Sequence, residues 1–348
     1  MQAIAGGSFQ NWIDRAAVVG LWEVIKNYSF FRREFNRTLA EIDAEQPACI
    51  VLIDYPGFNL RLSRALSGKP NRPRIIYYIS PQVWAWNRGR IRHMARWLDL
   101  MLCIFPFEAE LYNKSGLRTV FVGHPMHERL EAKRTSSTRD PNLVALFPGS
   151  RQREVRKILP VMVEAANLLR QQNSQLRFEI AAASPELESW ISLQLSSLPG
   201  EQRGSFRVTQ GRSAAAMQEA CAGIIASGSA TLEAAWFRLP FVLVYRVSWL
   251  TYLAGRLVIK VKHLGMPNVI AGRSVVPEFI QHDAKPGPVA KEVLRLMKDI
   301  SARERMLIDF DEIIGSLGTG GASDRAATTI MAELNSPGRA REAAASSL

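Results

Sequence analysis

The chain is poor in the features that mark secreted, membrane-spanning and metal-binding proteins. Its 348 residues include only three cysteines, Cys49, Cys103 and Cys221, and none of them has the spacing of metal ligands. This scarcity excludes a disulfide framework and indicates buried thiols in a reducing compartment. Apolar runs long enough to span a membrane and a signal-peptide pattern at the amino terminus are also missing. We therefore expect a cytoplasmic protein.

The common catalytic and nucleotide-binding motifs are missing as well. The sequence has no Walker A motif, no GxGxxG, no GxSxG and no zinc-ligand spacing. We therefore expect no metal and no cofactor, so that any phosphate is bound by backbone N–H groups and arginine. What the chain does have is excess positive charge, with 44 Lys and Arg against 32 Asp and Glu and a net charge of +12. This balance favours anionic partners, namely phosphorylated substrates, an acidic membrane surface or nucleic acid.

Strand-like and helix-like segments alternate along most of the chain. The strand-like segments are continuous apolar runs, which is typical of parallel sheets that are covered on both faces. A polar stretch without periodicity, residues 131–142, predicts a linker between two units. The alternation restarts after it, with a helix expected over 214–221 and a loop over 266–273. The sequence thus predicts an α/β protein of two doubly wound units, with ligands bound at the carboxyl ends of the strands.

The most informative run is Ser227-Gly-Ser-Ala-Thr-Leu-Glu233, which follows a predicted strand and opens a predicted helix. This layout points free backbone N–H groups and the positive end of a helix dipole toward an anion. The carboxylate of Glu233, one turn into the helix, is placed to accept hydrogen bonds from a ribose diol. The run predicts a nucleotide-diphosphate site, although small residues are also common at ordinary strand-to-helix turns. The diphosphate is assigned to Ser227, Gly228, Ser229, Ala230 and Thr231.

A second turn of the same kind, Pro148-Gly-Ser-Arg151, follows the first predicted strand of the second unit. Gly149 permits close backbone approach, Ser150 is expected to cap the next helix, and Arg151 could hold a phosphate bidentately. The alternative is a plain helix cap followed by a solvated arginine.

The stretch 266–273 carries two more polar side chains that could reach the same anion. Asn268 and Arg273 are the donors in question. The alternative is an irregular connection without a ligand.

Two residues of the first unit could act as a general base. Asp54 ends a predicted strand, and an acid at that edge points into the cleft, where it could take a proton or bind a sugar hydroxyl. The competing interpretation is an N-cap for the next helix, a role that Asn59 could also fill. His124 follows the last predicted strand of the unit, although a lone histidine is more often structural.

Aromatic residues stand next to cations in three segments. The loop Ser80–Arg90 holds Trp84 and Trp86 ahead of basic residues, which suits stacking on a sugar or on nucleic acid. Core tryptophans beside a basic helix face are the alternative. The segments Trp22–Arg37 and Trp249–Lys262 resemble amphipathic basic helices that lie on anionic lipid. The alternative for both is a helix with one buried and one solvated face.

Taken in order, seven segments closely resemble those of lipid-A-disaccharide synthases, and the resemblance runs over residues 10–330. The segments are Ile53–Asn59, Tyr78–Trp86, Phe105–Glu108, Phe121–Pro125, Phe147–Arg151, Ala226–Glu233 and Pro267–Arg273. The resemblance implies a GT-B glycosyltransferase with two Rossmann-like domains that face each other across a cleft. It divides the chain into an acceptor-side domain (1–135), a UDP-sugar domain (136–317), a helix that crosses back to the first domain (318–335) and a disordered tail (336–348).

The implied reaction joins UDP-2,3-diacylglucosamine to 2,3-diacylglucosamine 1-phosphate, with inversion at the anomeric carbon and without a metal. The products are the β-1,6-linked disaccharide 1-phosphate and UDP. The resemblance implies a peripheral protein on the cytoplasmic face of the inner membrane, and a homodimer is left open. The acceptor or lipid side is assigned to Asn59, Ser80, Trp84, Trp86 and Glu108. Nucleic acid is not expected, because the cations are interleaved with bulky apolar residues.

The chain departs from the family pattern in two places. Some members carry a second acid at the position of Gly57, where it is a favoured catalytic residue, so the choice of base falls on Asp54. The family's opening strand and its Gly-Glu-x-Ser-Gly-Asp loop are not found in the sequence. We expect a misassigned start or a truncated gene, with a neighbouring strand left exposed.

Two other functions compete with the implied one. An enzyme similar to UDP-N-acetylglucosamine 2-epimerase would use a similar nucleotide site, but it predicts more acids and histidines in the cleft and no membrane-seeking helices. The other is a non-catalytic remnant that binds nucleotide or lipid, if the missing strand abolishes turnover.

Overall fold

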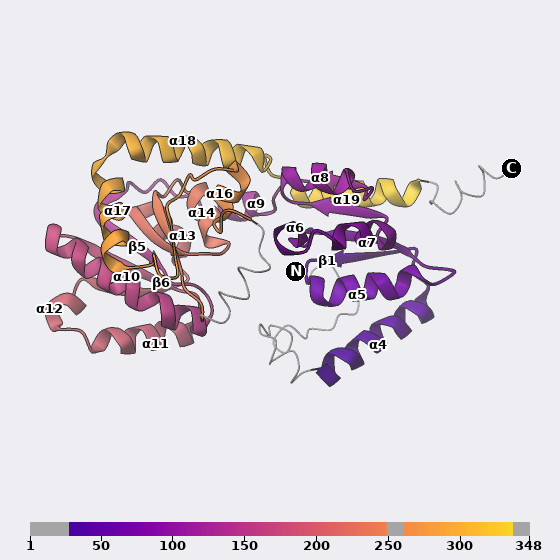
Figure 1. Ribbon diagram of the computed structural model, residues 1–348, viewed down its shortest axis with the longest axis horizontal. Helices are drawn as coiled ribbons and strands as arrows, with labels where there is room; N and C mark the ends of the chain where they lie inside the picture. Colours follow the sequence, from indigo (N-terminus) through magenta and orange to yellow (C-terminus); the bar gives the residue numbers. More distant parts are fainter. Residues whose placement is uncertain (1–27, 249–260, 337–348) are drawn as a thin grey trace.

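The protein has two α/β units that lie next to each other, each built around one parallel sheet (Figure 1). The computed structural model describes residues 28–248 and 261–336. The first unit contains α4 (Tyr28–Glu45), β1 (Cys49–Ile53), α5 (Pro56–Ser67), β2 (Arg74–Tyr78), α6 (Val83–Trp86), α7 (Arg90–Trp97), β3 (Leu100–Cys103), α8 (Pro106–Asn113), β4 (Thr119–Phe121) and α9 (Met126–Glu131). The second contains β5 (Asp140–Phe147), α10 (Gln152–Gln172), β6 (Arg177–Ala182), α11 (Pro185–Ser196), α12 (Gly200–Arg203), β7 (Phe206–Gln210), α13 (Ser213–Glu219), β8 (Ala220–Ala226), α14 (Ala230–Trp236), β9 (Phe241–Tyr245), α16 (Met266–Ala271), β10 (Glu278–Ile280), α17 (Pro286–Lys298) and α18 (Ile300–Ser316). The last helix, α19 (Ala322–Asn335), lies on the first unit.

The first sheet has four parallel strands in the order β1-β2-β3-β4, so each strand pairs with the next one in the sequence. Its inner strands are apolar, and all four residues of β3 are buried. This is the pattern expected of strands that are covered on both faces. Strand β1 lies at one edge, where the side chains of Val51 and Ile53 are exposed.

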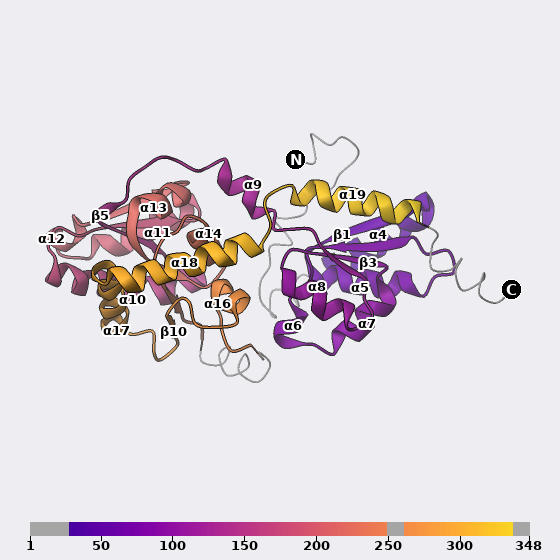
Figure 2. The same ribbon diagram turned by 90° about the horizontal axis from the view of Figure 1, so that it is seen from above.

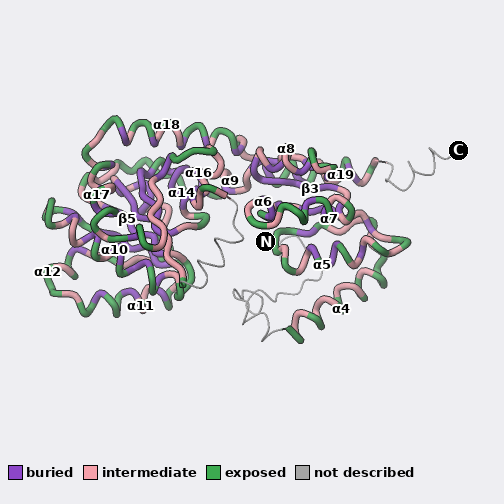
Figure 3. The backbone as a smooth tube through the Cα atoms, in the orientation of Figure 1, coloured by how far each residue is buried: buried purple, intermediate pink, exposed green. Residues whose placement is uncertain are grey.

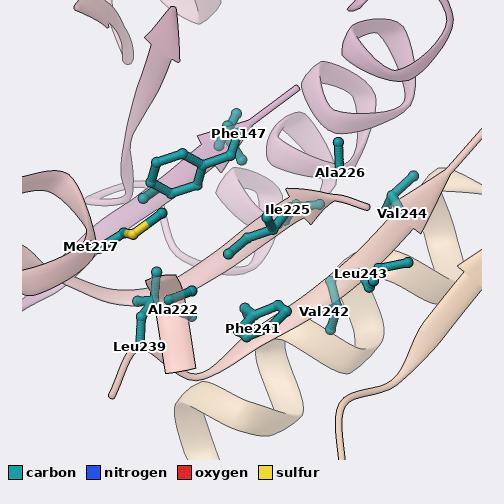
Figure 4. Close-up of a cluster of buried hydrophobic side chains, with 14 of the residues drawn as sticks. Phe147, Met217, Ala222, Ile225, Ala226, Leu239, Phe241, Val242, Leu243 and Val244 are labelled. Atoms are coloured by element: carbon teal, nitrogen blue, oxygen red, sulfur yellow. The ribbon is translucent and has the colours of Figure 1, made fainter. Parts of the chain in front are cut away.

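The second sheet has six parallel strands in the order β10-β9-β8-β5-β6-β7. Buried residues follow these strands, and exposed residues lie on the outer sides of the surrounding helices (Figure 3). Figure 4 shows side chains of β8 and β9 gathered in one apolar cluster that also includes Phe147 and Met217. This packing fixes the carboxyl ends of the central strands β5 and β8, which carry the two turns predicted to bind an anion.

Helix α19 packs against the first unit (Figure 2). Its inner face joins a small apolar cluster with residues of β2 and β3. The carboxylate of Glu333 forms an ion pair with Arg118, and Arg325 Nε donates a hydrogen bond to the Val122 carbonyl at 2.8 Å. Gly123 has φ of +89°, and a Cβ at this position would collide with the Arg325 guanidinium. The backbone conformation therefore favours glycine here, and a larger residue would also displace the Arg325 guanidinium.

The α/β architecture with parallel sheets is as predicted, but two element boundaries differ from the expected ones. The linker is shorter than 131–142, because its last three residues already belong to β5. The helix expected over 214–221 ends at Glu219, and Cys221 lies in β8. All three cysteines are free thiols.

The stretch 266–273 is not a loop. Helix α16 occupies most of it, with Pro267 in the first turn and the left-handed Gly272 as its C-cap residue. Proline and glycine are the residues that commonly occupy these two helix positions. The prediction of a loop over 266–273 is therefore wrong for residues 266–271.

Several expectations fall on residues outside the described ranges. They concern the start of Trp22–Arg37, nearly all of Trp249–Lys262 and the tail that follows residue 336. Within the described ranges, no helix is both long and apolar enough to cross a membrane.

Candidate functional site

Left-handed backbone conformations gather where the strands of both sheets end. In the first sheet, Asp54 and Tyr55 follow β1 with φ of 47° and 45°, and Ile79 follows β2 with φ of 63°. In the second sheet, Gly149 follows β5 with φ of 110° and Gly228 follows β8 with φ of 154°. A positive φ is costly for residues other than glycine, and most of all for a β-branched residue such as Ile79. Strain of this kind clusters at functional sites. Four of the six described non-glycine residues with positive φ follow a strand, whereas Gln46 and Arg238 precede one.

The turn between β8 and α14 has free donors and open space beside it. No atom lies within 4 Å of the position that a Cβ of Gly228 would occupy. Among the described residues, the backbone N–H groups of Gly228 and Ser229 have no hydrogen-bond acceptor. The Thr231 hydroxyl, buried behind the turn, donates to the Gly228 carbonyl at 2.8 Å, and Ser227 Oγ donates to the Leu264 carbonyl at 3.4 Å. The turn offers two backbone donors to an anion, while the Thr231 hydroxyl holds its shape.

The turn after β5 places Arg151 at the same edge of the second sheet. Arg151 is the N-cap residue of α10, and no side chain caps this helix, so the expectation that Ser150 caps it is wrong. The Arg151 guanidinium pairs with Glu154 at 2.9 Å and is 57% exposed. Burial raises the pKa of Tyr245 at the end of β9, and the charges of Glu154 and Arg151 act on it in opposite directions. Arg151 therefore lies within electrostatic reach of β9, across the end of β8.

The carboxylate of Glu233 is joined to the first unit. Its Oε1 accepts a hydrogen bond from Arg129 Nη2 at 2.7 Å, and Arg129 lies on α9, just after the last strand of the first sheet. This ion pair connects the predicted nucleotide turn with the acceptor-side unit. Sequence reasoning missed Arg129, and the only available signal was its place one turn after the strand-end residue His124.

The two donors predicted in the stretch 266–273 are engaged by other protein groups. Asn268 is buried, its Oδ1 accepts from two consecutive backbone N–H groups at 2.8 Å, and its Nδ2 donates to Glu278 Oε1 at 2.8 Å. Arg273 forms two hydrogen bonds with Asp309 on α18, at 2.8 and 2.9 Å. Asn268 thus holds the segment before β10 in place. Contact of either side chain with a ligand stays a prediction, and for Arg273 it requires release from Asp309.

The carboxylate of Asp54 is exposed and does not cap a helix. Helix α5 has Tyr55 as its N-cap residue and no side-chain cap. Asn59 Nδ2 donates to the backbone carbonyls of Asp54 at 2.7 Å and Ile53 at 3.2 Å, and the buried Tyr77 hydroxyl donates to the Asp54 carbonyl. These bonds hold the backbone of the loop. Among the described residues, they leave the Asp54 carboxylate itself without a hydrogen-bond partner.

His124 differs from Asp54 in both charge and place. Its Nδ1 accepts a hydrogen bond from the Met126 backbone at 3.1 Å, so the proton of the neutral ring is on Nε2. Burial, with a contribution from the charge of Arg129, lowers the His124 pKa to about 4. His124 and Asp54 follow the two edge strands of a four-stranded sheet, about 14 Å apart at about 4.8 Å per strand. The two residues therefore approach the cleft from opposite edges of the sheet.

A buried carboxylate, Glu108, anchors the tryptophan loop. It accepts hydrogen bonds from Ser80 Oγ at 2.5 Å and from Trp84 Nε1 at 2.8 Å. Trp86 is exposed, and the Arg90 guanidinium lies over its ring. Three of the residues assigned to the acceptor side thus form one buried hydrogen-bonded group, whereas Trp86 faces solvent.

The titration of Glu108 should be visible in the stability of the protein. Burial raises its pKa from 4.5 to about 7, against the opposite effect of the hydrogen bonds from Ser80 and Trp84. The folded protein binds a proton on Glu108 more tightly than the unfolded chain does. The stabilisation that this proton provides is therefore complete below pH 4.5 and is lost as the pH rises to about 7. Glu108→Gln cannot ionise and should flatten Tm over this window. Thermal melts of both proteins across the window are the measurement, and parallel Tm profiles would contradict the expectation.

Comparisons with known proteins connect this geometry to a family. Residues 1–321 match the family model described as lipid-A-disaccharide synthetase. The lipid-A-disaccharide synthase of Syntrophus aciditrophicus is 38% identical over 331 residues, which cover 91% of this chain and 84% of that protein. The corresponding protein of Geobacter sulfurreducens is 37% identical over 323 residues, which cover 90% and 83%.

Solved structures show the same fold at low sequence identity. UDP-GlcNAc 2-epimerase from Neisseria meningitidis bound to UDP-GlcNAc has a TM-score of 0.60 at 12% identity, covering 90% of this chain and 82% of that chain. The glycotransferase of kitacinnamycin has a TM-score of 0.55 at 15% identity, covering 86% and 79%. The prediction of an α/β fold of the GT-B type is confirmed. Because a shared fold does not determine function, it does not separate a transferase from an epimerase.

Proposed function

We propose that this chain, which belongs to the lipid-A-disaccharide synthase family, joins its two sugar substrates by direct displacement between the two units. It is a glycosyltransferase of lipid A biosynthesis and acts on lipid A precursors. The proposed donor is UDP-2,3-diacylglucosamine and the proposed acceptor is 2,3-diacylglucosamine 1-phosphate. The family match over residues 1–321 is the observation that carries this assignment.

The donor diphosphate is proposed to bind at the carboxyl edge of the second sheet. The free backbone N–H groups of Gly228 and Ser229 and the guanidinium of Arg151 would bind the phosphate oxygens. Glu233 accepts from Arg129 with one carboxylate oxygen and would bind the ribose with the other. Donors that are already in place stabilise the charge that builds on UDP as it leaves.

The free carboxylate of Asp54 is proposed as the general base. The 6-oxygen of the acceptor attacks the anomeric carbon of the donor while the bond from that carbon to the UDP oxygen breaks. The bonding electrons leave with UDP, and the hydroxyl proton moves to Asp54. His124 is neutral and its Nδ1 lone pair is engaged by the Met126 backbone N–H, so its Nε2–H would act as a hydrogen-bond donor in the cleft. The buried group around Glu108 would shape the acceptor side without touching the reacting atoms.

The proposed function is tested by measuring UDP release from the donor with and without the lipid acceptor. A synthase releases UDP only when the acceptor is present and forms disaccharide in equal amount. UDP release without acceptor, or epimerised sugar nucleotide among the products, would contradict the proposal. Sustained turnover by the 348-residue chain would also exclude the non-catalytic alternative.

Contact with an anionic membrane surface is proposed for the start of α4. Tyr28 is exposed there, beside the exposed cations Arg32 and Arg33. Further along the same helix, Phe35 packs against Phe58 with ring centroids 5.7 Å apart. The described part of this helix therefore packs against α5 in its later turns, and the exposed Tyr28, Arg32 and Arg33 of its first turns would meet lipid headgroups.

A further inference from the structure

A long stretch of the first unit carries positive charge and no negative charge. Between Asp54 and Asp99 there is no Asp or Glu, but there are eight arginines and one lysine. Groups elsewhere in the protein bind three of these cations, Lys69, Arg72 and Arg74. The remaining arginines lie on α5, on α7 and in the turn that precedes α7.

Four of these arginines line one groove between α5 and α7, two helices that pack against each other. Arg61 and Arg64 come from α5, and Arg90 and Arg96 come from α7, with His93 on the same wall. The groove has a volume of about 800 Å³, and its described lining contains no carboxylate. All four arginines are exposed, and none of them forms an ion pair with a described residue. We refer to this feature as the arginine groove.

The neighbouring elements do not supply the missing negative charge. On α4, the helix packed against α5, three of the four acids are already paired with cations outside the groove, and neither the fourth, Glu45, nor Asp54 belongs to the groove lining. Guanidinium groups in one groove repel each other, and this repulsion opposes the compact state. A bound anion would remove it, and arginine is the side chain best suited to phosphate because its planar donors match the phosphate oxygens.

A cavity lined mainly by aromatic side chains, together with Arg32 and Arg61, adjoins the arginine groove. It lies between α4 and α5 and has a volume of about 310 Å³. Gly57 and Arg61 line both the cavity and the groove. The aromatic residues of the cavity are Tyr28, Phe31, Phe35, Tyr55 and Phe58. A cationic surface and an aromatic cavity thus meet at Gly57, three residues after the proposed base Asp54.

We infer that the arginine groove binds the phosphate group of a lipid whose hydrocarbon chain enters the adjoining aromatic cavity. A free nucleotide would use the cations but has no chain for the cavity, and a neutral lipid would leave the arginines unpaired. A phosphorylated lipid matches both features at once. The phosphate has two sources, the lipid acceptor itself and an anionic phospholipid of the membrane. Assigning the phosphate to the lipid acceptor rests on the proposed function, whereas assigning it to a membrane phospholipid does not.

The test replaces the four groove arginines with glutamine, as Arg61→Gln, Arg64→Gln, Arg90→Gln and Arg96→Gln in one protein. The matched control removes four exposed cations from the second unit, as Arg203→Gln, Lys291→Gln, Lys298→Gln and Arg305→Gln. Both variants lose the same charge, and their melting curves check that both are folded. One arm measures the acceptor KM and kcat in neutral detergent micelles. The other measures sedimentation with vesicles of phosphatidylglycerol or phosphatidylcholine and needs no turnover.

The groove variant should differ from the control in at least one arm. If the phosphate belongs to the acceptor, the acceptor KM rises by about tenfold or more, with kcat within about twofold of wild type. If it belongs to a phospholipid, the acceptor KM stays unchanged and binding to phosphatidylglycerol vesicles falls by a similar factor. A groove variant that matches the control in both arms would overturn the inference. A wild-type protein without turnover would contradict the proposed function and leave the vesicle arm as the test of the groove.

Discussion

An Asp54→Asn enzyme should turn over at about one hundredth to one ten-thousandth of the wild-type kcat, with a nearly unchanged KM for the sugar nucleotide. The change removes the proton acceptor and little else. Asparagine has the same shape as aspartate and tolerates the left-handed conformation of this position, where φ is 47°. The backbone carbonyl that accepts from Asn59 and Tyr77 is also unaffected. Steady-state kinetics with both substrates, together with a melting curve, provide the measurement.

His124→Asn is the matched control for this experiment. The asparagine Oδ1 can replace Nδ1 as the acceptor of the Met126 backbone N–H, so the local turn is kept. Because the Nδ1 lone pair of His124 already accepts from the Met126 backbone N–H, we expect the ring to take little part in proton transfer. We expect kcat to fall by less than about tenfold. A severe loss in the histidine variant with a mild loss in Asp54→Asn would place the base at the β4 edge instead.

Most strands of both sheets could be predicted because they are short apolar runs that end in small or polar residues, whereas the three-residue β10 was not predicted. Polar segments were harder to assign. Residues 140–142 look like linker, yet they extend β5 because Asp140 pairs with Ala220 of the neighbouring strand. The stretch 266–273 looks like loop, yet most of it forms α16, which packs against α14 and α18. In both places a contact with a distant segment outweighs the local pattern.

The candidate site also contains some features that a local pattern predicts and others that depend on distant contacts. Its turns are contiguous in the sequence and could be found there, but the partners of their charged groups are far away. Glu233 is 104 residues from Arg129, and Arg273 is 36 residues from Asp309. No local pattern predicts such pairs. The arginine groove is intermediate, because the lack of acids between Asp54 and Asp99 is visible in the sequence, whereas only the fold brings the arginines of two helices together.

An Arg151→Ala enzyme should lose about 10²–10³-fold in kcat and bind UDP more weakly, because it lacks a donor to the leaving diphosphate. The guanidinium is exposed and pairs with Glu154, so its removal should leave the fold unchanged. Arg151→Lys should recover only part of the activity, since a single ammonium cannot bind two phosphate oxygens in the planar manner of arginine. Turnover with both substrates and calorimetric titration with UDP measure the two effects.

Arg177→Ala is the matched control for Arg151→Ala. Its side chain is 64% exposed, against 57% for Arg151, and it also pairs with a carboxylate, that of Asp140. It begins β6, however, and so lies at the opposite, amino-terminal edge of the second sheet. Because both changes remove one charge and one exposed ion pair, only the position relative to the turns differs. Equal UDP affinity in the two variants would show that the diphosphate does not bind at the carboxyl edge between β5 and β8.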